Sequence, residues 1–171
     1  NKGYSRVIDA LPAIKKQIPD VKYLLVGGGD YLAETRKLIQ EKNLENDVIL
    51  TGMIRDDERI GYYNLCDVFI LPSKGEGCPA MVVLEALLCG KPVVIGEREC
   101  SKNALSNGEL GIMVNPDSID EISSAIIEIL TKKNQKVLSG DKLRQKTVEE
   151  YGFDNFRKSV QSLLLSLKNQ S

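Results

Sequence analysis

The feature that most constrains the fold of this chain is a regular alternation of short apolar runs with stretches of helical periodicity. The apolar runs have the length of β-strands and lie at residues 21–26, 48–50, 68–71, 92–95 and 111–114. Helices are predicted at residues 4–16, 32–42, 57–65, 80–89 and 116–130, followed by two more at 135–150 and 154–168. Strands that alternate with helices connect through right-handed βαβ units. We therefore predict an α/β fold, a doubly wound parallel sheet with helices on both faces.

The first of these runs, Val21–Val26, is almost continuously apolar and ends in three glycines. Strands that are buried on both faces of a parallel sheet have this composition. We therefore expect this strand to be fully covered.

The size and charge of the chain indicate what kind of protein it is. The chain has 171 residues, of which 42% are apolar and 27% charged, which predicts a single globular domain over residues 1–171. Its net charge of −1 does not indicate nucleic-acid binding. The charge is uneven, since residues 131–171 hold 9 of the 23 basic and only 4 of the 24 acidic side chains. That basic end is either a solvated helix face or a surface for an acidic partner or membrane.

The residue types limit the chemistry. Histidine is absent, so any proton transfer must use carboxylates, lysine, tyrosine, cysteine or the substrate. The four cysteines include no C-x-x-C pair, so we expect neither a metal site nor a disulfide framework. Buried thiols in a reducing compartment, the cytoplasm, are the expected arrangement.

Glycine and carboxylate residues follow the predicted strands, where parallel sheets bind their ligands. Gly27-Gly28-Gly29 after the first strand allows either a tight turn or close approach of a ligand. Glu76 lies in a glycine-flanked loop, and Glu85 lies in the apolar helix that follows. A carboxylate in an apolar helix needs a partner. For Glu85 that partner is either a pair of ligand hydroxyls or a basic side chain in a structural salt bridge.

The same stretch resembles the donor-binding signature of the retaining glycosyltransferases of group 1 (family 4), which have the GT-B fold. It carries Pro72-Ser73, Glu76-Gly77, Glu85-Ala86 and Gly90-Lys91-Pro92-Val93-Val94 in the family's order. Further matches cover residues 2 to about 130 and lie at Lys2-Gly3, Val26–Gly29, Val48–Gly52, Asn64–Ser73 and Asn107–Gly111. The resemblance implies the Rossmann-like donor half of a GT-B enzyme. It also implies that the first strand of that half, which would precede Lys2, is missing.

The resemblance implies a role for each matching residue. Lys2 would bind the diphosphate of a UDP- or GDP-sugar, and the backbone N–H groups of Ala80 and Met81 would face the diphosphate or the sugar. Gly28 would let the backbone approach the donor. Two further pairs complete the set. Met53 and Ile54 would flank the base, while Glu76 would hold sugar hydroxyls near the reacting carbon and Glu85 would accept both ribose hydroxyls. The family usually needs no metal, so we expect no cofactor.

One spacing departs from the family pattern. Eight residues separate Glu76 from Glu85, one more than in the family. If the helix contained the extra residue, the Glu85 side chain would point about 100° away from its position in the family, because each helical residue turns by that angle. We expect the loop to absorb it, because Glu85 keeps its register with the Gly-Lys-Pro-Val-Val segment that follows.

The resemblance also sets expectations beyond these residues. The N-terminal acceptor domain of the family is not in this sequence, so we expect this stretch alone to be inactive in sugar transfer. The implied function is donor binding in glycan, polysaccharide or glycolipid synthesis, and the alternative is a non-catalytic nucleotide-binding or scaffolding domain. We expect a cytoplasmic protein, with peripheral association at the inner membrane face through Lys132, Lys133, Lys136, Lys142, Arg144 and Lys146.

Overall fold

The structure, a computed structural model, describes residues 2–74, 80–97 and 105–168 of the chain. The helices are α1 Tyr4–Lys15, α2 Leu32–Glu41, α3 Arg59–Leu65, α4 Met81–Leu88, α5 Ile119–Leu130, α6 Gly140–Tyr151 and α7 Phe153–Lys168. The strands are β1 Tyr23–Val26, β2 Val48–Gly52, β3 Phe69–Leu71, β4 Val93–Gly96 and β5 Gly111–Val114. The residues described also include two short 3₁₀ turns, η1 Asp56–Glu58 and η3 Ser106–Gly108. The alternation predicted from the sequence is confirmed, with α6 beginning later than expected.

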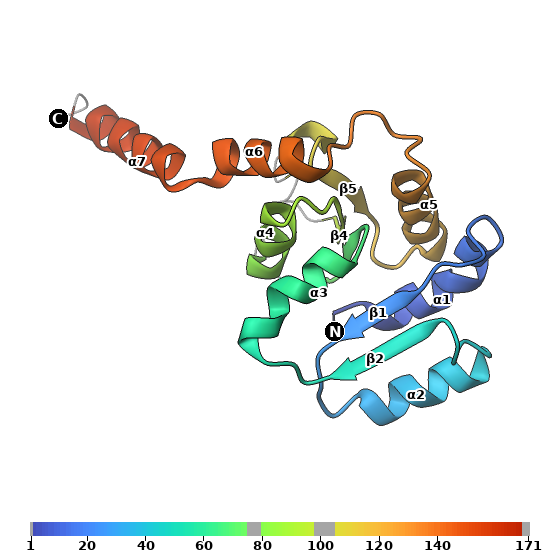
Figure 1. The fold of residues 1–171 in the computed structure, drawn as a ribbon. Helices are drawn as coiled ribbons and strands as arrows, with labels where there is room; N and C mark the ends of the chain where they lie inside the picture. The colour runs from blue at the N-terminus through green and yellow to red at the C-terminus, as the bar shows by residue number, and fades with distance from the viewer. Residues whose placement is uncertain (1, 75–79, 98–104, 169–171) are drawn as a thin grey trace.

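The strands are all parallel to their partners but form two sheets. β1 pairs with β2, and β4 lies between β3 and β5 in the second sheet. Helices cover both faces, so the predicted α/β class is confirmed (Figure 1). The single continuous sheet is replaced by sheets of two and three strands.

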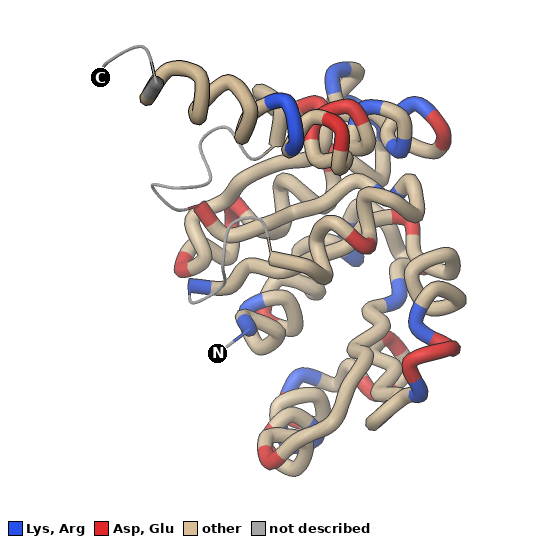
Figure 2. The backbone as a smooth tube through the Cα atoms, turned by 90° about the vertical axis from the view of Figure 1, so that its left-hand side faces the viewer, with Lys and Arg blue, Asp and Glu red and all other residues tan. Residues whose placement is uncertain are grey.

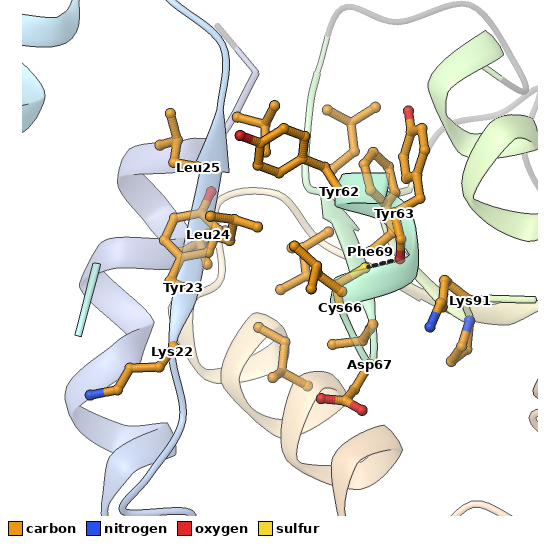
Figure 3. A pocket seen from close by; sticks show the side chains of 18 of the residues that line it. Lys22, Tyr23, Leu24, Leu25, Tyr62, Tyr63, Cys66, Asp67, Phe69 and Lys91 are labelled. Atoms are coloured by element: carbon orange, nitrogen blue, oxygen red, sulfur yellow. Dashed lines mark hydrogen bonds between the residues drawn. The ribbon is translucent and has the colours of Figure 1, made fainter. Parts of the chain in front are cut away.

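A cavity of about 1730 Å³ separates the two sheets and is lined on one side by β1 and on the other by β3. Figure 3 shows Tyr23, Leu24 and Leu25 on one wall, with Cys66, Asp67 and Phe69 on the other. One more parallel strand between β1 and β3 would join the two sheets in the order β2-β1-strand-β3-β4-β5. The gap therefore lies where the resemblance leads us to expect the first strand of the donor half.

The gap also explains a wrong expectation about β1. Val26 is 41% exposed, and the remaining residues of β1 are only partly buried, although the run was expected to be covered on both faces. β4, by contrast, is buried along its whole length, because it has a strand on each side. Burial in this chain therefore follows the position of a strand in its sheet, which the apolar run does not encode.

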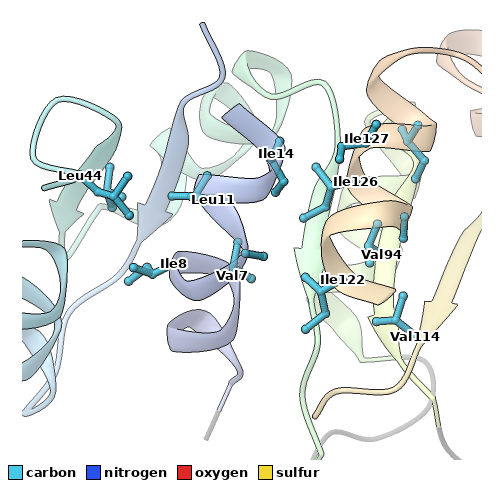
Figure 4. Packing of buried hydrophobic residues seen from close by; sticks show 14 of the residues in the cluster. Val7, Ile8, Leu11, Ile14, Leu44, Val94, Val114, Ile122, Ile126 and Ile127 are labelled. Atoms are coloured by element: carbon cyan, nitrogen blue, oxygen red, sulfur yellow. The ribbon is translucent and has the colours of Figure 1, made fainter. Parts of the chain in front are cut away.

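Helix α1 joins the two halves. Figure 4 shows its Ile8 and Leu11 directed towards β1, while Val7 and Ile14 face α5. All four side chains are buried, and they belong to one apolar core that includes Leu44, Val94, Val114, Ile122 and Ile126. Pro12 lies within α1 without ending it. Because this core draws residues from both sides of the gap, it holds the two sheets in place.

The C-terminal helices differ in their attachment. Leu143 of α6 is fully buried in a second core against α4 and β4. Helix α7 extends away from the body of the protein (Figure 1), and its large apolar side chains are exposed. Figure 2 shows α7 as a mainly uncharged segment. In the described part of the chain, no helix is long and apolar enough to span a bilayer.

Candidate functional site

The glycines that follow β1 meet the residue that follows β2. Gly27 and Gly29 have positive φ angles of 124° and 144°, which L-residues with a side chain rarely adopt. A Cβ on Gly28 would lie 2.9 Å from Cγ of Met53, so a larger residue here would have to displace that side chain. Met53 is 82% exposed and lines the cavity beside Ile54. The structure thus brings together Gly28, Met53 and Ile54, three residues predicted to face the donor.

The N-terminal Lys2-Gly3 pair lies at the end of β3. A Cβ on Gly3 would be 2.2 Å from the carbonyl oxygen of Pro72, and Gly3 has a φ of 79°. This contact places Lys2 at the carboxyl end of the second sheet, and Lys2 lines the same cavity as Gly28 and Met53. Lys2, which is predicted to bind the diphosphate, and Met53 and Ile54, which are predicted to flank the base, therefore line the same cavity.

Helix α4 begins at the same end of the second sheet. Ala80 is its N-cap in an extended conformation, and Met81 is its first residue and 69% exposed. The first N–H groups of a helix have no intrahelical acceptor and carry the positive end of its dipole. No acidic residue stands in the first turn of α4, so no side chain of that turn competes with an anion there. Ala80 and Met81 thus lie at the start of the helix, but neither lines the cavity that Lys2, Gly28 and Met53 share, and their role towards the donor stays a prediction.

The two glutamates have different outcomes. Glu76 lies outside the described residues, and so does most of the loop expected to absorb the extra residue. Glu85 lies one turn into α4, which is helical from Met81 to Leu88.

The carboxylate of Glu85 is bound by two side chains of α3. The hydroxyl of Tyr63 donates a hydrogen bond of 2.9 Å to Oε2, and Nη1 of Arg59 lies 3.3 Å from Oε1. The structure therefore contains the salt bridge that was one of the two alternatives for Glu85. The Glu85 side chain is 30% exposed and that of Arg59 45%, so the pair lies at the surface. Such pairs stabilise a fold by only about 0–1 kcal/mol.

Arg59 and Tyr63 were not predicted from the sequence. Both line the cavity, whereas Glu85 does not. The signal in the sequence was their spacing of four residues in a helix, which places both side chains on one face. Nothing local indicates that this face meets α4, because that contact joins segments more than 20 residues apart.

Burial and hydrogen bonding act on the titratable groups around Glu85. Burial raises the pKa of Tyr63 well above its usual value, and the hydrogen bond to Glu85 raises it further. The hydroxyl therefore stays protonated and can serve as a donor. Burial also raises the pKa of Cys66, whose Sγ lies 3.1 Å from the carbonyl oxygen of Tyr63 (Figure 3).

The acidic cluster after β2, Asp56–Glu58, forms the short 3₁₀ turn η1 and caps it. The backbone N–H of Arg55 donates a hydrogen bond of 2.9 Å to Oε2 of Glu58, and Asp57 pairs with the Arg55 side chain. Among the described residues, no group of three or more cysteine and acidic side chains is placed to hold a metal ion. The independence from metal stays a prediction.

Comparison with known proteins identifies the family. A family model described as "Glycosyl transferases group 1" matches residues 1–150. The chain belongs to this family. A GDP-mannose-dependent α-(1-6)-phosphatidylinositol monomannoside mannosyltransferase of Mycobacterium tuberculosis is 27% identical over 169 residues. That match covers 95% of this chain and 44% of the relative. A phosphatidyl-myo-inositol mannosyltransferase of Mycolicibacterium smegmatis is 30% identical over 75% of this chain and 33% of its own length.

Solved structures of glycosyltransferases agree in fold with this group 1 domain. Sucrose-phosphate synthase from Thermosynechococcus elongatus superimposes with a TM-score of 0.75 at 27% identity, over 99% of this chain and 43% of that protein. The Anabaena protein Alr3699/HepE, in complex with UDP and glucose, gives a TM-score of 0.74 at 26% identity over 96% and 45%. The GT-B resemblance is therefore confirmed. The group 1 domain spans less than half the length of the relatives it matches.

Proposed function

We propose that this chain is the donor-binding domain of a retaining glycosyltransferase and that it binds a UDP- or GDP-sugar. The observation that carries the proposal is that Lys2, Gly28, Met53 and Ile54, which lie near the carboxyl ends of β1, β2 and β3, all line the cavity between the two sheets. A nucleotide occupies only part of that volume, since ligand sites usually measure about 300–1,000 Å³. The rest is the gap between β1 and β3.

Each part of the donor has matching groups in the proposal. Lys2 and the N–H groups of Ala80 and Met81 offset the charge of the diphosphate. Met53 and Ile54 flank the base. The carboxylate of Glu85 accepts the ribose hydroxyls, and Glu76 holds hydroxyls of the transferred sugar. As the bond to the sugar breaks, negative charge grows on the departing diphosphate, so Lys2 and the helix N–H groups stabilise the transition state.

Calorimetric titration of the chain with UDP and with GDP tests the proposal. We expect binding of at least one nucleotide, weakened by Glu85→Ala. The alternative, a scaffolding domain that binds no nucleotide, predicts no heat of binding for either. Absence of binding, or binding that Glu85→Ala leaves unchanged, would contradict the proposal.

The relatives suggest the setting of the reaction. Two of them are named as mannosyltransferases that act on phosphatidylinositol acceptors. We propose by analogy that the whole protein transfers a hexose in glycolipid synthesis, with an N-terminal acceptor domain as the second partner. It would work at the cytoplasmic face of a membrane.

A lipid acceptor requires contact with a membrane surface. Two of the basic residues proposed for that contact have partners within the chain, since Lys146 pairs with Glu109 at 3.2 Å and Arg144 donates to the carbonyl of Leu88 at 2.8 Å. Lys132, Lys133, Lys136 and Lys142, together with the apolar side chains of α7, support the contact. Co-sedimentation with vesicles is the test. We expect binding to anionic vesicles only, and equal or absent binding to anionic and neutral vesicles would contradict it.

A further inference from the structure

We infer that Tyr63 and Arg59 are positioning residues, which orient the carboxylate of Glu85 so that it can accept both hydroxyls of a ribose. This inference rests on the proposed function, in which Glu85 binds the ribose of the donor. It assigns to helix α3 a part in nucleotide recognition that the sequence motif on α4 does not contain.

The geometry gives each carboxylate oxygen one donor. Tyr63 binds Oε2 and Arg59 binds Oε1, so the carboxylate is held at both oxygens from the same helix. A carboxylate has about four acceptor positions, two on each oxygen. With one position on each oxygen occupied by α3, one position on each is left. Two remaining acceptors, one per oxygen, match two neighbouring hydroxyl donors.

Tyr63 is itself held in place by packing, and Arg59 has a second acidic neighbour at the surface. Tyr63 is 9% exposed, and its ring lies 5.7 Å from the ring of Phe69, measured between centroids. Arg59 also approaches Asp56, with Nη2 and Oδ1 3.7 Å apart. A glutamate side chain is flexible and would lose rotamer freedom on binding a ligand. Holding its carboxylate in advance reduces that entropic cost, which raises affinity without any new contact to the nucleotide.

Accessibility is consistent with this role. The Glu85 side chain is 30% exposed, and its partners Arg59 and Tyr63 line the cavity, whereas Glu85 does not. Val82, one turn before Glu85 in α4, lines the cavity. A ribose held near Val82 would therefore lie about one helical turn from Glu85 and would meet the acceptor positions that α3 leaves open.

The test compares nucleotides with and without the ribose hydroxyls. Affinities for UDP and GDP are measured by calorimetry beside their 2′,3′-dideoxy forms, using the 171-residue chain and its Tyr63→Phe, Arg59→Gln and Arg59→Lys variants. We expect Tyr63→Phe and Arg59→Gln each to weaken binding of the ribonucleotide by roughly five- to tenfold, the size of one modest hydrogen bond. Binding of the dideoxy form should not change, and Arg59→Lys should restore part of the loss.

Further variants separate positioning from stability. In a Glu85→Gln background, Tyr63→Phe and Arg59→Gln should cause no additional loss, because they act through Glu85. Arg36→Gln removes an exposed arginine from α2 and serves as the matched control. Arg59 is 45% exposed, so its substitution keeps the test valid even where Tyr63→Phe lowers the melting temperature.

The outcomes distinguish this inference from the proposed function. Equal weakening for the ribo and dideoxy forms, or no weakening at all, would overturn the positioning role. If Glu85→Gln abolishes the preference for the ribo form while the α3 variants keep it, the proposed function stands and the inference fails. If the unmodified chain shows no preference for the ribo form, both fail.

Discussion

Gly3 lies so close to Pro72 that a Cβ on Gly3 would be 2.2 Å from the carbonyl oxygen of Pro72. This single contact places the start of the chain against the end of β3 and brings Lys2 to the cavity. The left-handed φ of 79° at Gly3 is part of the same turn. Both features require glycine, for conformational as well as steric reasons.

Gly3→Ala should therefore destabilise the fold and weaken nucleotide binding. We expect the free energy of unfolding, measured with urea, to fall by about 2–4 kcal/mol, because a strained φ and a backbone overlap combine. Gly61→Ala is the control, since a Cβ at this position in α3 meets no atom within 4 Å. That substitution should be neutral or slightly stabilising, and equal effects of the two changes would contradict the role of the Pro72 contact.

The open edges of the two sheets predict a pattern of hydrogen exchange. The N–H of Tyr23 bonds to Asp47 and that of Phe69 to Pro92, so alternation directs the N–H groups of Leu24 and Ile70 towards the gap. We expect these two amides to exchange faster than those of Tyr23 and Phe69.

A strand supplied in the gap should protect the same two amides. Joining a short Val- and Ile-rich segment ahead of Lys2 is expected to slow exchange at Leu24 and Ile70 and to raise the melting temperature. A matched segment with alternating lysine and glutamate is the control, because it cannot bury apolar side chains in the gap. Unchanged exchange at both amides would show that the gap does not accept a strand.

Acid should weaken the fold through Asp47. This residue is only 5% exposed and pairs with Lys15 and Lys22, and the hydrogen bond from Lys15 is the main cause that lowers its pKa. A lowered folded-state pKa contributes stability above the unfolded value of about 3.9, and that stability is lost as the pH falls through the folded value. We expect the urea midpoint to drop below about pH 4 and the drop to be smaller in Asp47→Asn. Glu41→Gln, an exposed carboxylate on α2, should retain the full drop.

The stability of the apolar core between α1 and α5 should depend on Ile126. Its side chain is 2% exposed and faces the core shared by α1 and α5. Ile126→Ala should lower the free energy of unfolding by about 2–5 kcal/mol, through lost burial and a cavity. Leu163→Ala on α7 removes a side chain that is 60% exposed and should change stability by less than about 0.5 kcal/mol. Comparable losses in the two variants would place α7 in the folded core.

The candidate site was predictable where its residues follow strands. Gly28, Met53 and Lys2 were assigned from the family resemblance, and the structure places them around one cavity. Arg59 and Tyr63 were missed, because their role depends on how α3 packs against α4. For Glu85 the sequence allowed a ligand or a salt bridge, and the choice of Arg59 as partner required the three-dimensional contact.

The amino-acid sequence alone determined the order and type of the helices and strands, because hydrophobic periodicity and glycine placement act over a few neighbouring residues. Tertiary structure decided which strands pair, how far β1 is buried and which side chains hold Glu85. These properties depend on segments distant in the chain. The backbone N–H and C=O groups along a strand edge find hydrogen-bond partners only in a strand that the fold brings beside it. In the described structure, the edges of β1 and β3 that face the gap have no neighbouring strand.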